Sequence, residues 1–141
     1  MSHPNALKNY QQVETQAVLN TTPHQLILKL FDGVLTRLAA ARGHIDRREI
    51  AAKGEALGKA ISIIGGLRGS LNHIDGGEIA ANLEGIYEYC ERQLIAANVE
   101  NDIKLIDEVV GLLREVRAAW VEIPSDLHSQ TAEIPQAATA S

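Results

Sequence analysis

The sequence lacks the residue patterns that build metal, haem and disulfide sites. It has a single cysteine, Cys90, which excludes an internal disulfide framework and is typical of a reducing compartment. It contains no Cys-x-x-Cys-His and no His-Glu-x-x-His motif. A di-iron bundle needs Glu-x-x-His pairs, but the residues three before the last four histidines are Thr21, Ala41, Ser70 and Ser125. We therefore expect no metal, no cofactor and no catalytic residues, and we interpret Cys90 as a buried structural thiol.

An excess of positive charge and a long apolar run are also missing. The formal net charge is −5 and the sequence pI is about 5.5, which argues against a nucleic-acid partner. No segment approaches the roughly 20 apolar residues that span a bilayer, and residues 1–21 lack the apolar core of a signal peptide. These features predict a cytoplasmic protein without stable membrane insertion. One basic cluster, interpreted as a solvated corner between helices, consists of Arg42, Arg47, Arg48 and Lys53.

Proline is absent between positions 24 and 123, as expected for long helices, which proline would break. Thr22-Pro23-His24-Gln25 has the spacing of a capping box with proline at the first helical position. Asp46 to Glu49 and Asp75 to Glu78 repeat this spacing with acidic caps, and a fourth start lies at Asn101 or Asp102. The predicted helices are 23–43, 47–71, 77–97 and 102–121.

The apolar residues of these segments recur every three or four positions, as on one face of a helix. Short connections make successive helices antiparallel, so the pattern predicts an all-α, up-down four-helix bundle in one domain, residues 1–124. Residues 1–21 are predicted to form a short, weakly amphipathic segment packed on the bundle, and the polar residues 125–141 are predicted to be a disordered tail. The predicted core stripes are Ile27, Phe31, Val34, Leu38, Ala41 and Ile45; Ile79, Leu83, Ile86, Cys90, Leu94 and Ala97; and Ile106, Val109, Leu113, Val116 and Trp120.

Two features exceed what a plain bundle needs. The second helix carries two apolar stripes, and the fourth adds Leu105 and Leu112 beside its main stripe. A second apolar face indicates either a wide core or a further partner. The second helix also carries a line of small residues, which favours either tight internal packing or a groove for a partner's helix. The two stripes are Leu57, Ile61, Ile64 and Leu71, and Ala56, Ala60, Ile63 and Leu67; the small residues are Gly54, Gly58, Ser62 and Gly66.

Taken together, these residues resemble the FliS family of flagellin-specific export chaperones over about residues 5–123. The motifs of the first helix are Thr22 to Ile27 (TPHQLI) and Leu30 to Gly33 (LFDG), and Tyr10 resembles the tyrosine of the family's N-terminal segment. The later helices match at Ala52 to Leu57, Lys59-Ala60, Ile63-Ile64, Gly76 to Ala80, Asn82-Leu83, Tyr87, Tyr89, Ala97-Asn98, Asn101-Asp102, Glu108-Val109, Leu112-Leu113 and Ala119-Trp120.

The resemblance implies a cytosolic chaperone that binds the disordered C-terminal segment of flagellin, prevents premature filament polymerisation and contacts a component of the flagellar export gate. It also implies that residues 1–21 can cover part of the binding surface as a lid when flagellin is absent. The alternatives are a structural helical homodimer, or homodimerisation in the free state, and a generic helix-binding adaptor. The predicted partner-binding residues are Leu7, Tyr10, Gly54, Gly58, Ala60, Ile63, Leu67, Leu105 and Leu112.

Overall fold

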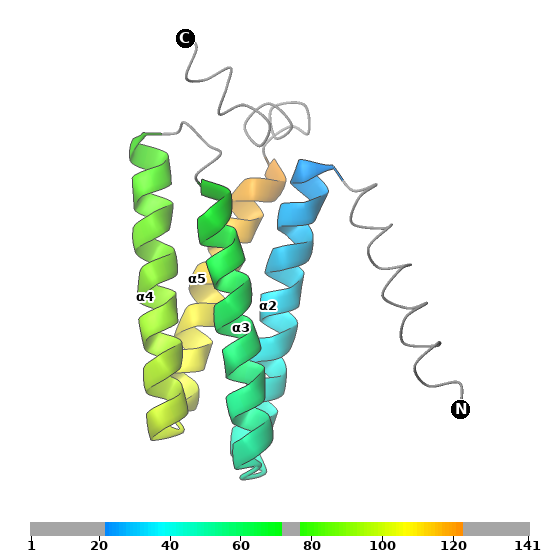
Figure 1. The fold of residues 1–141 in the computed structure, drawn as a ribbon, viewed down its shortest axis with the longest axis vertical. Helices are drawn as coiled ribbons and strands as arrows, with labels where there is room; N and C mark the ends of the chain where they lie inside the picture. The colour runs from blue at the N-terminus through cyan, green and yellow to red at the C-terminus, as the bar shows by residue number, and fades with distance from the viewer. Residues whose placement is uncertain (1–21, 72–76, 123–141) are drawn as a thin grey trace, which may run out of the picture.

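The computed structural model describes residues 22–71 and 77–122, which form four α-helices. In chain order they are α2 (Pro23–Asp46), α3 (Ile50–Ser70), α4 (Glu78–Glu100) and α5 (Ile103–Glu122). Each helix packs against its neighbour in sequence, and α5 returns to pack against α2. Figure 1 shows the four helices side by side as an antiparallel bundle. The predicted all-α up-down bundle is confirmed.

The first and last helix starts follow the predicted capping chemistry. Thr22 and Gln25 form the reciprocal capping box, in which the Gln25 amide donates to Thr22 Oγ1 at 3.1 Å and Pro23 opens α2. At the start of α5, the Lys104 amide donates to Asp102 Oδ1 at 2.9 Å. Both side chains therefore satisfy backbone donors that a helix N-terminus leaves without partners.

The predicted acidic cap at Asp46 is wrong. Asp46 is the last residue of α2, and α3 begins at Ile50 after Glu49. Arg48 adopts a φ of +59° in the turn, and the Glu49 carboxylate lies 2.7 Å from His44 Nδ1 and 3.0 Å from Arg47 Nε. Hydrogen bonds from His44 and Arg47 lower the pKa of Glu49, so these residues serve the corner rather than a helix cap.

The ends of α4 also differ from the prediction. Its N-cap residue is Gly77, with φ +51°, a backbone conformation that glycine tolerates best. Asp75, the predicted cap, lies outside the described residues. The helix continues three residues past Ala97 to Glu100, and Asn101 ends it in the left-handed conformation. Asparagine is a favoured non-glycine residue at this position, so the Asn101–Asp102 connection to α5 stays short.

The apolar stripes meet along the bundle axis and form one core. Cys90 is buried as predicted, and burial raises the pKa of its thiol to about 11. Two positions on α4 correct the predicted stripe. Ile79 is 67% exposed, because the first turn of α4 extends past the end of α3 (Figure 1). Tyr87, not predicted as core, is buried, and burial raises its pKa to about 12.

The lid segment 1–21, with Leu7 and Tyr10, and the tail 125–141 lie outside the described residues. None of the helices within residues 22–71 and 77–122 has the length and hydrophobicity that a membrane span requires.

Candidate partner-binding face

The second apolar stripe of α3 belongs to the core. Ala60 is completely buried and Leu67 is 1% exposed, and both lie among the residues that fill the bundle. A partner cannot reach these two side chains while the bundle stays folded, so they leave the predicted binding surface. The two stripes form a single wide buried face, because α3 packs on one side against α2 and on the other against α4.

The other aliphatic candidates lie at the margin of the core. Ile63, Leu105 and Leu112 are half-buried and pack against the buried cluster. Ile63 faces α2, where a Cβ built on Gly33 would lie 3.5 Å from Ile63 Cδ1. These residues leave part of their surface exposed, but their main contacts are internal.

The glycines of α3 lie on its outer side. A Cβ built on Gly54 or Gly58 would meet no described atom within 4 Å, and the same holds for Gly65, Gly66 and Gly69. Among the described residues, these glycines therefore do not serve a close approach to a neighbouring helix. The sequence leaves two interpretations of these glycines: tight internal packing or a groove for a partner's helix. The described contacts do not show internal packing at these glycines.

Exposed aliphatic side chains lie beside this part of α3. Ile95 and Val99, one turn apart on α4, are 54% and 77% exposed, and Ile50 at the start of α3 is 60% exposed. Hydrogen bonds from Lys53 to Asn98 and from Arg68 to Glu84 fix the alignment of the antiparallel pair. From these two contacts we infer that Gly54 lies about level with Val99, and Gly58 about level with Ile95.

We call this surface the α3–α4 face and define it by Ile50, Gly54, Gly58, Ile61 and Gly65 of α3 and Ile95 and Val99 of α4. The sequence prediction missed Ile95 and Val99. A signal was available, since these residues lie four positions apart and outside the core stripe that contains Leu94 and Ala97.

A buried lysine closes one end of the α3–α4 face. Lys53 is only 4% exposed, which corrects its assignment to a solvated basic corner. Its ammonium group donates to the Asn98 carbonyl at 2.8 Å and to Asn101 Oδ1. A cation at the C-terminal end of α4 satisfies a carbonyl of the last turn and interacts favourably with the helix dipole.

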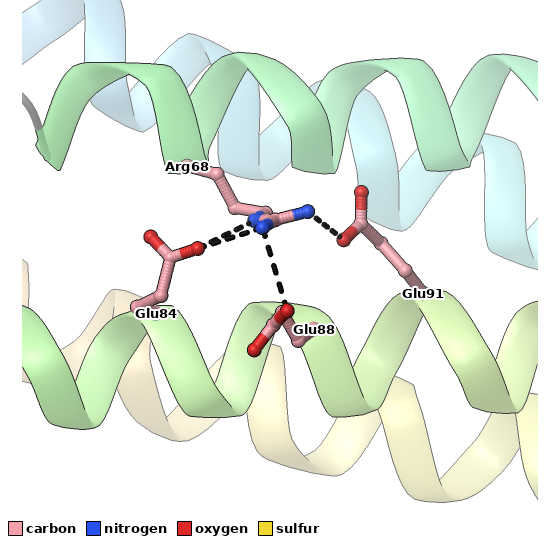
Figure 2. Close-up of polar contacts among 4 residues, drawn as sticks. All are labelled: Arg68, Glu84, Glu88 and Glu91. Atoms are coloured by element: carbon pink, nitrogen blue, oxygen red, sulfur yellow. Dashed lines mark hydrogen bonds and ion pairs between the residues drawn. The ribbon is translucent and has the colours of Figure 1, made fainter.

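An acidic cluster around one arginine forms the other end (Figure 2). Arg68 of α3 donates to Glu84 and Glu91 of α4, each at 2.7 Å, and its Nη2 lies 3.6 Å from Glu88 Oε1. The hydrogen bond to Glu84 is the main cause that raises the pKa of the Arg68 guanidinium above its ordinary value. Three carboxylates thus surround one positive charge.

Residues 22–71 and 77–122 hold no group of three or more His, Cys, Asp or Glu side chains that could bind a metal ion. The arrangement of the α3–α4 face is suited to contact with a macromolecule, since it combines aliphatic side chains, open backbone and charge at its rim.

Comparison with known proteins decides the family. The model of the family described as "Flagellar protein FliS" matches residues 6–126 of this chain. The chain belongs to the FliS family. It is 51% identical over 116 residues to flagellar secretion chaperone FliSB of Pseudomonas aeruginosa, covering 82% of this chain and 92% of the relative. It is 47% identical over 119 residues to flagellar secretion chaperone FliS of Salmonella typhimurium, covering 83% and 88%.

A Vibrio cholerae protein, also named flagellar secretion chaperone FliS, is 37% identical over 128 residues, covering 90% of this chain and 94% of the relative. The resemblance predicted from the sequence is therefore confirmed. FliS is a family of chaperones rather than enzymes.

Proposed function

We propose that this protein is a cytosolic export chaperone that binds the C-terminal segment of flagellin on the α3–α4 face. Three relatives carry the name flagellar secretion chaperone, which supports the general role. The observation that supports this surface is the open glycine backbone of α3 beside the exposed Ile95 and Val99. Isolated exposed aliphatic residues are ordinary, but a group of them beside open backbone indicates a docking surface.

A surface that binds a disordered segment must offer a large contact area. A disordered segment that folds on binding pays the free energy of ordering, about 2–5 kcal/mol or more, from its contacts with the chaperone. Glycine at positions 54 and 58 lets the backbone of a bound helix come closer to α3, so that its apolar side chains can reach Ile95 and Val99. This is the helix-on-groove mode of peptide recognition.

The direct test mixes the purified full chain with a peptide of the flagellin C-terminal segment. We expect a one-to-one complex by calorimetry, and a far-UV circular dichroism signal with more helix than the sum of the parts. A scrambled peptide of the same composition is the control. No gain of helix at saturating peptide would contradict the proposal.

The lid expected from the family resemblance makes a separate part of the proposal. If residues 1–21 must leave before flagellin binds, the apparent affinity falls by the fraction of open molecules. With about 1–10% open, a chain starting at Asn20 should bind the peptide about 10- to 100-fold more tightly. Tyr10→Ala should act in the same direction. Weaker binding with a large fall in the unfolding midpoint would show that the segment is structural.

The proposed function also includes contact with a component of the flagellar export gate. A pull-down with the flagellin-bound chaperone tests this contact. The second candidate is a homodimer, which the exposed Ile50, Ile95 and Val99 favour because two copies could cover these side chains. Sedimentation at several concentrations separates the two: a stable dimer that persists with saturating peptide would favour the structural role.

A further inference from the structure

The α3–α4 face is chemically different at its two ends, and this difference bears on how a ligand lies on it. The aliphatic side chains Ile50 and Val99 are at one end, and the carboxylates around Arg68 are at the other. We propose that the face fixes the direction of the bound helix: its aliphatic residues lie over Ile95 and Val99, and a lysine or arginine reaches Glu88. This inference rests on the proposed function.

The charge balance supports a cationic side chain at the acidic end. Glu84, Glu88 and Glu91 contribute three negative charges and Arg68 one positive charge. The cluster stays net negative even when the exposed Arg92, one helical turn from Glu88, is counted with it. An added lysine or arginine would be attracted and an added carboxylate repelled, as expected of a rim that selects a partner by charge.

Glu88 is the carboxylate best placed to receive that cation. Arg68 contacts Glu84 and Glu91 at 2.7 Å, but Glu88 only at 3.6 Å, beyond hydrogen-bond distance. The Glu88 side chain is also 49% exposed, whereas that of Glu91 is 18% exposed. In Figure 2 Glu88 lies between the other two carboxylates on α4. It therefore keeps most of its capacity to accept hydrogen bonds.

Helix geometry sets the spacing in the ligand. Ile95 lies seven positions after Glu88, which is about 10 Å along α4 at 1.5 Å per residue. A bound helix lying along the pair should therefore carry its aliphatic residues and its basic residue about two turns apart. The reverse orientation would place the aliphatic side chains of the ligand over the carboxylates and its basic residue over Ile95. The Glu88 carboxylate and the basic residue would then both lose water without gaining an ionic partner.

The experiment measures binding of the flagellin C-terminal peptide to Glu88→Lys and to Glu115→Lys, an equal charge change at an exposed position on α5. At low ionic strength we expect Glu88→Lys to weaken binding about five- to tenfold, with most of the loss recovered in about 1 M salt. Glu115→Lys should stay within about twofold of the wild type. Glu88→Gln, which keeps the shape of the side chain, should give a smaller loss in the same direction.

A variant peptide tests the direction of the bound helix. In this peptide, glutamate replaces the basic residue that lies two turns from the aliphatic group. It should bind the wild type more weakly and regain affinity on Glu88→Lys. Equal affinities for Glu88→Lys and Glu115→Lys, with the wild type still binding, would overturn the direction while leaving the proposed function intact. No binding of the peptide to the wild type would overturn both.

Discussion

The α2–α5 seam and the α3–α4 seam are stabilised by polar contacts in different ways, a seam being the line of contact between two neighbouring helices. Polar contacts recur along the α2–α5 seam: Arg42 with Asp107 at 3.0 Å, Arg117 with Asp32 at 2.9 Å, and Trp120 Nε1 with the His24 carbonyl at 3.3 Å. The α3–α4 seam has polar contacts near its ends, at Lys53 and at Arg68. Between them lies the α3–α4 face, which the glycines of α3 and the exposed Ile95 and Val99 of α4 form.

The difference separates two tasks. Contacts spread over a seam hold two helices together along their length, and they leave no uninterrupted apolar surface for a partner. Contacts at the ends hold the helices equally in register, but they keep the middle of the surface available. If the α3–α4 seam has fixed ends and an open middle, substitutions at its ends should destabilise the fold, and substitutions in its middle should not.

The largest effect on stability should come from the buried end. In Lys53→Met, the Asn98 carbonyl and Asn101 Oδ1 lose a charged donor, and hydrogen bonds to charged groups contribute about 1.5–3 kcal/mol. We expect the free energy of unfolding to fall by about that amount in urea titrations. Lys59→Met, at a half-exposed position six residues further along α3, is the control and should change the free energy of unfolding by about 0.5 kcal/mol or less. Equal effects would mean that Lys53 does not fix the end of the seam.

The open middle should accept a side chain without cost to the fold. Gly58→Leu should raise the free energy of unfolding by about 0.5–1 kcal/mol, because glycine is unfavourable inside a helix and the new Cβ meets no described atom. The same change should weaken binding of the flagellin peptide.

Gly33→Leu is the matched variant on α2, where the new Cβ alone would already lie in van der Waals contact with Ile63 Cδ1 at 3.5 Å, and the three further carbon atoms of leucine would crowd Ile63. Overpacking of this kind typically costs about 1–3 kcal/mol, so the unfolding midpoint should fall. A lower midpoint in Gly58→Leu would show that the α3 glycines pack against something inside the protein and are not an open surface.

The α2–α5 seam should show many small effects. Asp107→Asn removes the ion pair with Arg42, and both side chains are about half exposed. Exposed pairs contribute little and are screened by salt, so the unfolding midpoint should fall slightly and the difference from wild type should vanish in about 1 M salt. A large loss that persists in salt would mean that this seam also depends on a single contact.

The smallest effect concerns pH at the α4–α5 seam. Hydrogen bonds from Gln93 and then Tyr89 lower the pKa of Glu108 below its ordinary value of 4.5. A lowered folded pKa gives stability that is present above the unfolded pKa and is lost as pH falls through the folded value. The difference in unfolding midpoint between wild type and Glu108→Gln should therefore be constant above about pH 5 and shrink on acidification.

Most of the fold could be predicted from the sequence, because helix caps and apolar periodicity are local. Thr22 to Gln25 and Asp102 form caps through residues two or three positions apart. The wrong prediction at Asp46 has a local cause too. Glu49 pairs with His44 and Arg47 in the turn, and the Asp46-to-Glu49 spacing is the same whether Glu49 belongs to a capping box or to such a turn. Ile79 was misassigned because periodicity shows the direction of a side chain, but not whether a neighbouring helix extends that far.

Less of the binding face could be predicted, since it depends on which helix lies beside which. The four-residue spacing of Gly54 and Gly58 places them on one side of α3, and that side is open. Ala60 and Leu67 are buried instead, because the sequence of one helix does not show how wide the core is. The contacts of Arg68 join residues 16 to 23 positions apart, and Lys53 donates to a carbonyl 45 positions away. Contacts at such separations depend on how α3 and α4 pack, so a local sequence pattern does not reveal them.

The order of packing around the bundle has a consequence for how the protein folds. Three of the four main helix contacts join neighbours in sequence, and only α2 with α5 joins the first described helix to the last. Local contacts form quickly, whereas closure over a long chain segment costs more entropy. We expect the α2–α5 pair to close last, so that its ion pairs act mainly on the rate of unfolding. A helical hairpin of α2 and α3 could thus be complete while the ribosome is still adding α5.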